Sequence, residues 1–125
     1  LALERTGLAR HANTRAGTLT LLNRKRLELA RAIATRPKML LLDEIAGGLT
    51  EAECHDLVAL ITEIKDSGVT IVWIEHVLHA LLSVVDRILV LDFGEVVAQG
   101  EPETIMKSPA VSTIYLGLEP EAADA

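Results

Sequence analysis

Aromatic residues are almost missing from this sequence of 125 residues, which holds one Trp, one Tyr and one Phe although half of its residues are hydrophobic. A folded interior must therefore consist mainly of Leu, Ile, Val and Ala. Such aliphatic side chains are typical of the parallel strands of α/β proteins. A chain of this length suits one small domain, which buries roughly two-thirds of its unfolded surface.

Cysteine is nearly absent as well, because Cys54 is the only one. An internal disulfide is excluded, and the composition is compatible with a cytosolic protein. The longest apolar runs, residues 39–42 and 69–74, fall far short of the ~20 residues that cross a bilayer, so no membrane span is predicted. The chain begins with Leu and has no basic-then-apolar signal segment, so we expect it to be cut from a longer chain.

Acidic residues are scarce in the first part of the chain. Residues 1–38 hold nine Lys or Arg against two acids, whereas residues 39–125 hold three against sixteen, and the net charge is −6. The basic part either faces phosphates or is a solvated helix face. No aromatic residue lies among the basic ones, so nucleic-acid binding gains no support.

Helices are predicted from caps and apolar spacing. Residues 1–10 indicate the end of a helix, followed by a loop at 10–18. Thr20 is predicted to cap a helix that runs to about residue 35, where Pro37 stops it. The next helix starts with a capping box formed by Thr50 and Glu53 and ends at a glycine, Gly68.

Residues 39–42 and 69–74 are short apolar runs, which predict two strands covered on both faces in a parallel sheet. A short helix is expected at 77–84. Residues 88–91 and 95–98 flank a predicted hairpin turn in which Gly94 takes a positive φ. Two small helices are expected at 102–107 and 110–116, and the acidic tail from residue 119 is predicted to be mobile.

Polar side chains follow both predicted parallel strands, since Asp43 and Glu44 end the first and His76 follows the second. Parallel strands joined by a helix bring such residues to one crevice at their carboxyl ends. Paired acids there suit a magnesium-nucleotide site, in which one holds the hydrated metal and the other orients water. Each residue also has a plainer interpretation: a turn cap for Asp43, a solvated acid for Glu44 and a strand-end imidazole for His76.

The order and spacing of several segments resemble the ABC ATPase family over nearly the whole chain. Residues 19–33 resemble the signature motif and its helix, 39–44 the Walker B strand, 46–50 the D-loop, 74–76 the switch-histidine segment, and 86–91 with 94–100 the closing strands. The sequences of the loops are most similar to those of the ATPase subunits of branched-chain amino acid importers. The resemblance implies an α/β fold, a partial P-loop NTPase core with its N-terminal half absent. It divides the chain into a helical subdomain end at 1–36, an ATPase-core part at 37–117 and a disordered tail at 118–125.

The resemblance also implies the site residues and the cofactors, ATP and Mg²⁺. Asp43 would bind Mg²⁺ through water, Glu44 would polarise the attacking water, and His76 would contact the γ-phosphate. The expected nucleotide contacts are Thr20, Asn23, Gly47 and Gly48.

Two departures from the family pattern bear on activity. Leu21 and Leu22 replace the glycines of the signature, and leucine side chains crowd a close phosphate contact unless both point into the protein. The chain also lacks a G-x-x-x-x-G-K-[ST] loop, the backbone cradle for the β- and γ-phosphates. The resemblance implies that the intact protein is an ATPase. Because the phosphate-binding loop is missing, this chain alone is expected to be inactive.

The partners implied by the resemblance are a second ATPase subunit in a head-to-tail dimer and transmembrane permease subunits, at the cytoplasmic face of the cell membrane. No nucleic acid is expected. An exposed sheet edge makes self-association of the chain a further hypothesis. The alternative function is a non-catalytic regulatory or interaction domain derived from an ABC ATPase.

Overall fold

The computed structural model describes residues 1–116, and the tail predicted at 118–125 lies outside the described residues. The chain divides into two compact units, Leu1–Val84 and the part from Val85 onward. This boundary falls inside the predicted part 37–117. The division into 1–36, 37–117 and 118–125 stays a prediction.

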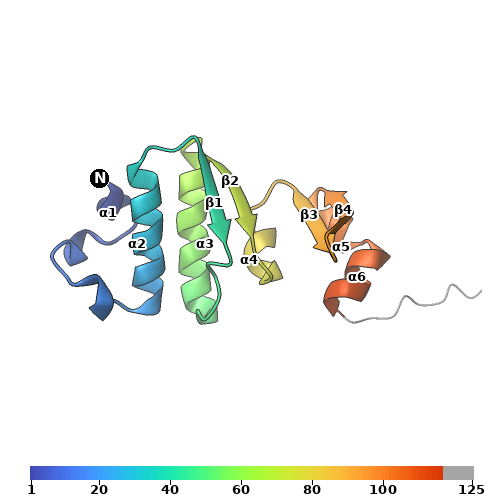
Figure 1. Ribbon diagram of the computed structural model, residues 1–125, viewed down its shortest axis with the longest axis horizontal. Coiled ribbons are helices and arrows are strands. Elements are labelled where there is room, and N and C mark those ends of the chain that lie inside the picture. The colour runs from blue at the N-terminus through green and yellow to red at the C-terminus, as the bar shows by residue number, and fades with distance from the viewer. Residues whose placement is uncertain (117–125) are drawn as a thin grey trace, which may run out of the picture. The chain divides into compact units, whose positions relative to one another are not determined.

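The two long helices of the first unit (Figure 1) begin at the caps that the sequence predicts. Thr20 accepts a hydrogen bond from Asn23 N at 3.3 Å and starts α2 (Leu21–Ala34). Thr50 and Glu53 form the predicted capping box, with bonds of 3.2 and 2.9 Å, at the start of α3 (Glu51–Asp66). The remaining helical elements are α1 (Ala2–Arg5), 3₁₀ turns at Ala9–His11 and Ala16–Thr18, and α4 (Leu78–Leu82).

Two strands of the first unit, β1 (Met39–Asp43) and β2 (Thr70–Ile74), pair in parallel as predicted, with α3 between them in the chain. Their inner face carries Leu40 and Leu42, which are buried among side chains of α2 and α3. The core consists of aliphatic residues, as the composition indicates: Leu22, Leu29, Ile33, Leu40, Leu42, Leu57, Leu60, Ile61, Ile64 and Val84. This packing fixes the carboxyl ends of both strands at one edge.

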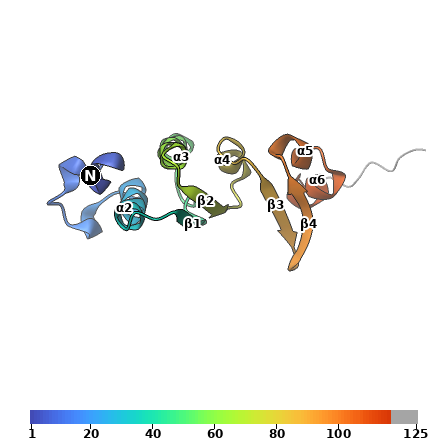
Figure 2. The same cartoon turned by 90° about the horizontal axis from the view of Figure 1, so that it is seen from above.

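The prediction that both strands are covered on both faces is wrong. Met39, Leu41, Val72 and Ile74 lie on the outer face and are exposed, Leu41 by 72%. Figure 2 shows α3 over one face of this sheet, and within residues 1–84 no helix covers the other. An apolar run does not distinguish one covered face from two, which is why the prediction failed.

The second unit is an antiparallel hairpin with two helices, and it matches the prediction. β3 (Ile88–Asp92) and β4 (Glu95–Gly100) are joined at Phe93 and Gly94, whose φ angles of 45° and 78° are both positive. Two positive φ angles are typical of the tight turns that suit hairpin twist. α5 (Pro102–Met106) and α6 (Pro109–Leu116) follow, and Val90, Ile105 and Val111 form the core of this unit.

Among the helices of residues 1–116, none has both the length and the apolar character to cross a bilayer.

Candidate functional site

The site begins where β1 and β2 end. Glu44 N donates a hydrogen bond of 2.7 Å to Ile74 O, so the pairing of the two strands continues one residue past β1. Glu44 has a φ of 48°, in the left-handed region that non-glycine residues rarely adopt. Backbone strain of this kind persists only where the surroundings enforce it, and it is concentrated at functional sites. Glu44 is thus held in an unusual conformation at the end of the strand.

The predicted proximity of Glu44 and His76 is confirmed. Glu44 Oε1 lies 3.6 Å from His76 Nδ1, and the two side chains are 60% and 68% exposed. Solvent screens a pair this exposed. The pair therefore contributes little to the free energy of folding, and both side chains remain accessible to a ligand. Their roles in hydrolysis stay predictions.

Asp43, the predicted water-mediated Mg²⁺ ligand, lies on the outer face of the sheet with Met39 and Leu41. It also borders a cavity of about 220 Å³ beside α2, together with Lys25 and Glu28. Within the described residues, no group of three or more His, Cys, Asp or Glu side chains is placed to hold a metal ion. Mg²⁺ keeps several waters and takes only one or two carboxylates plus substrate phosphates. An exposed aspartate fits such a role, whereas an all-protein magnesium cage does not form in this part of the chain.

Glu75 is the residue that sequence reasoning missed. Its side chain is 0% exposed. Its Oε2 accepts a hydrogen bond from Ala46 N at 3.0 Å, and its Oε1 accepts from His76 N at 3.1 Å and Val77 N at 3.4 Å. A buried carboxylate is tolerated only when groups of this kind satisfy it. The available sequence signal was an acid placed between an apolar strand and a histidine.

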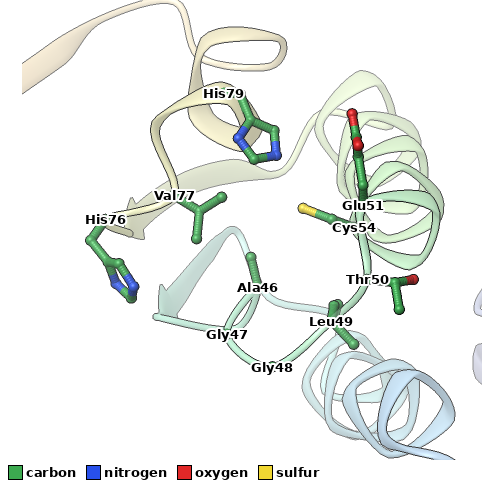
Figure 3. Close-up of a pocket in the computed structure, with 10 residues that line it drawn as sticks. All are labelled: Ala46, Gly47, Gly48, Leu49, Thr50, Glu51, Cys54, His76, Val77 and His79. Carbon is green, nitrogen blue, oxygen red and sulfur yellow. The ribbon is translucent and has the colours of Figure 1, made fainter.

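A cavity of about 290 Å³ lies beside Ala46 and His76 (Figure 3). Its lining comes from the turn after β1, the start of α3, the segment after β2 and α4: Ala46, Gly47, Gly48, Leu49, Thr50, Glu51, Cys54, His76, Val77 and His79. The structure thus brings Gly47 and Gly48 together with His76. Thr20 and Asn23 stand at the start of α2 and border neither cavity described for residues 1–116.

Leu21 and Leu22 differ in where they lie. Leu22 is buried in the core, whereas Leu21 is 45% exposed. An ideal Cβ on Gly48 would lie only 3.1 Å from Leu21 Cδ2, so the glycine of the turn packs closely against this leucine. Only Leu22 is therefore withdrawn into the core, and Leu21 stays partly exposed at the first position of α2.

Cys54, on the cavity wall, is buried. Burial raises the pKa of the Cys54 thiol, and the negative charge of Glu75 raises it further. The thiol is therefore neutral at neutral pH and behaves as a small packed side chain.

Comparison with known proteins defines the class. No protein-family model matches the chain. A solved structure of a nucleotide-free ATP-binding cassette from an ABC transporter superposes with a TM-score of 0.85 at 30% identity, over 94% of this chain and 48% of that one. In fold, the chain is therefore similar to the ATP-binding cassettes of ABC transporters.

Two sequence relatives give a more particular likeness. The chain is 43% identical over 116 residues to the high-affinity branched-chain amino acid transport ATP-binding protein BraF of Pseudomonas aeruginosa. It is 42% identical over 116 residues to the protein of the same description, LivG, of Escherichia coli. Both matches cover 92% of this chain and 46% of the relative, so the chain spans about half the length of the curated relatives it matches.

Proposed function

We propose that the chain is the C-terminal part of the ATP-hydrolysing subunit of an ABC importer for branched-chain amino acids or similar small solutes. The observation that carries this proposal is the meeting of Glu44 and His76, 3.6 Å apart, at the ends of two parallel strands. The 42–43% identity to ATP-binding proteins of branched-chain amino acid transport supports the solute class.

Each site residue has a chemical task in this proposal. The Glu44 carboxylate accepts a hydrogen bond from a water molecule and orients it, which favours attack of this water on a phosphoryl group. His76 offers an imidazole to an anionic oxygen, and Asp43 contacts a hydrated cation. Mg²⁺, when bound with ATP, would neutralise the charge that develops on the reacting phosphoryl group. The expected contacts at Thr20, Asn23, Gly47 and Gly48 would lie at the boundary with a second subunit.

The residues present fit one end of a nucleotide and not the whole of it. Exposed Glu44 and His76 suit a terminal phosphate, but the sequence contains no phosphate-binding loop. We therefore expect no ATP turnover by this chain alone. The proposed partners are a second ATPase subunit and transmembrane permease subunits, which place the protein at the cytoplasmic face of the membrane.

The test replaces Glu44 by Gln in the full-length protein that contains this chain. We expect kcat for ATP hydrolysis to fall by about 100-fold or more, because a positioned acid–base group contributes that much. Glu63→Gln is the matched control, since Glu63 is an exposed acid of α3 that lines neither cavity and loses the same charge. Turnover that survives Glu44→Gln would contradict the proposal. An inactive wild-type protein would also contradict it, and would favour an interaction domain.

A further inference from the structure

Glu75 joins two segments that are far apart in the chain. Its Oε2 holds the backbone of Ala46, two residues after Glu44, and its Oε1 holds the backbone of His76 and Val77. One carboxylate thus binds the turn that follows the Asp43-Glu44 pair and the segment that carries the histidine. The two segments are 29 residues apart in the sequence at this contact.

The carboxylate is also close to the imidazole itself. Glu75 Oε1 lies 3.6 Å from His76 Nδ1, the same nitrogen that lies 3.6 Å from Glu44 Oε1. Because the Glu75 side chain is fully buried and the other two are more than half exposed, Glu75 is the fixed member of the three. Hydrogen bonds to a buried charged acceptor are among the stronger ones in proteins, so they resist relative movement of the two segments.

We infer that Glu75 is a positioning residue, which sets the geometry of Glu44 and His76 through the backbone N–H groups of Ala46, His76 and Val77. This inference rests on the proposed function, since Glu44 and His76 are the groups proposed to act on the phosphate. Glu75 touches neither the water nor the phosphate in this scheme. Its contribution is to prevent the strand ends from separating when the exposed pair is disturbed.

Replacement by glutamine separates this role from mere space filling. A carboxylate accepts hydrogen bonds on both oxygens, whereas a glutamine amide accepts on one and presents N–H groups on the other side. Glu75→Gln keeps the volume and must lose either the bond to Ala46 N or the pair to His76 N and Val77 N. Whichever orientation the amide takes, one of the two segments is released.

The first experiment measures amide hydrogen exchange by NMR in the whole chain, wild type and Glu75→Gln. We expect exchange at Ala46, or at His76 and Val77 together, to accelerate by at least about tenfold in the variant. Amides of the α3 core, such as Leu57 and Ile61, report global opening and should keep their rates. Equal exchange at these three amides in both proteins would overturn the inference, and so would absence of protection in the wild type.

The second experiment measures steady-state ATP hydrolysis by the full-length protein with Glu75→Gln and with the control Glu63→Gln, at an exposed acid of α3 outside both cavities. We expect Glu75→Gln to lower kcat by about tenfold or more with an unchanged KM for ATP, because orientation is lost and nucleotide contacts are not. Equal kcat for the two variants, in a wild type whose turnover depends on Glu44, would overturn the inference and leave the proposed function intact. A wild type without turnover would instead refute the proposed function and, with it, the role of Glu75 in positioning catalytic groups.

Discussion

Glu75 and Cys54 are both ionisable side chains that are buried in the first unit, and the cost of their burial is lowered in different ways. Glu75 is satisfied by three backbone N–H groups. Cys54 keeps its proton, because burial and then the charge of Glu75 raise its pKa. A carboxylate supplied with donors and a neutral thiol can therefore share one neighbourhood without a large electrostatic penalty.

The raised pKa of Cys54 predicts a loss of stability at alkaline pH. The ordinary value is 9.0, and the native thiol holds its proton to higher pH than the unfolded thiol does. The contribution of Cys54 to the free energy of unfolding is thus complete below about pH 9 and is lost as the pH rises through the raised pKa. Urea unfolding between pH 7 and pH 11, followed by fluorescence of Trp73 in the first unit, measures it.

Cys54→Ala is the comparison for this prediction. The alanine variant is less stable at every pH because it removes a buried atom, but its free energy of unfolding should fall less steeply above pH 9 than that of the wild type. Identical slopes in the two proteins would show that the thiol does not titrate as described. In Glu75→Gln, the pKa of Cys54 should be raised less than in the wild type, since one of its two causes is removed. The alkaline loss of stability should therefore be smaller in this variant and should end at a lower pH.

At the residue level, the sequence predicted the exposed groups and missed the buried one. Glu44 and His76 follow apolar runs directly, so their places at strand ends could be inferred from the chain alone. The role of Glu75 depends on Ala46 N, which reaches it only after the strands have paired. No local pattern contains that contact, and therefore no local pattern could predict it.

Helix and turn boundaries were predicted well because their determinants are local. The capping bonds at Thr20 and at Thr50 with Glu53 form within four residues of chain, and Gly68 and Gly94 have the positive φ angles that their positions indicate. Strand burial was predicted badly because it depends on what other elements cover. The outer residues Met39 and Leu41 are as apolar as the inner ones, so the sequence carried no signal of the difference.

The turn between β1 and α3 supplies a prediction at this scale. Gly48 has a φ of 79°, and an added Cβ would lie 3.1 Å from Leu21 Cδ2. Gly48→Ala therefore combines backbone strain with a contact that requires Leu21 to move. We expect it to lower the free energy of unfolding by about 1.5–2.5 kcal/mol, from about 1 kcal/mol or more of left-handed strain plus crowding.

Two other glycines separate the strain from the crowding. Gly68 has a φ of 97° with open space around its Cβ position, so Gly68→Ala should show the strain alone, about 1 kcal/mol. Gly17 has open space and no positive φ, so Gly17→Ala should change stability by less than about 0.5 kcal/mol. Urea unfolding followed by Trp73 fluorescence ranks the three. Equal effects of the Gly48 and Gly68 substitutions would mean that Leu21 moves aside freely.

For the whole molecule, the main consequence of the fold is its exposed apolar surface. On the first unit, Met39, Leu41, Val72 and Ile74 form one outer sheet face. Monomeric soluble proteins rarely expose contiguous apolar patches of large size, and an unpaired strand edge is a template for further pairing. The hydrophobic effect therefore favours any arrangement that removes this face from water.

We expect the chain by itself to self-associate through this outer face, with a second copy as the occupant. Static light scattering over a wide range of protein concentration should show an apparent mass that rises with concentration. Replacing Leu41 and Val72 together by Thr puts a β-branched strand former at both positions and removes apolar area, so the apparent mass should fall towards that of a monomer. Leu89→Thr, at an exposed position on β3 of the second unit, is the control and should leave the association unchanged. A wild-type chain that stays monomeric at every concentration would show that the outer face does not bind a second copy, and a control as effective as the double variant would move the contact to the hairpin.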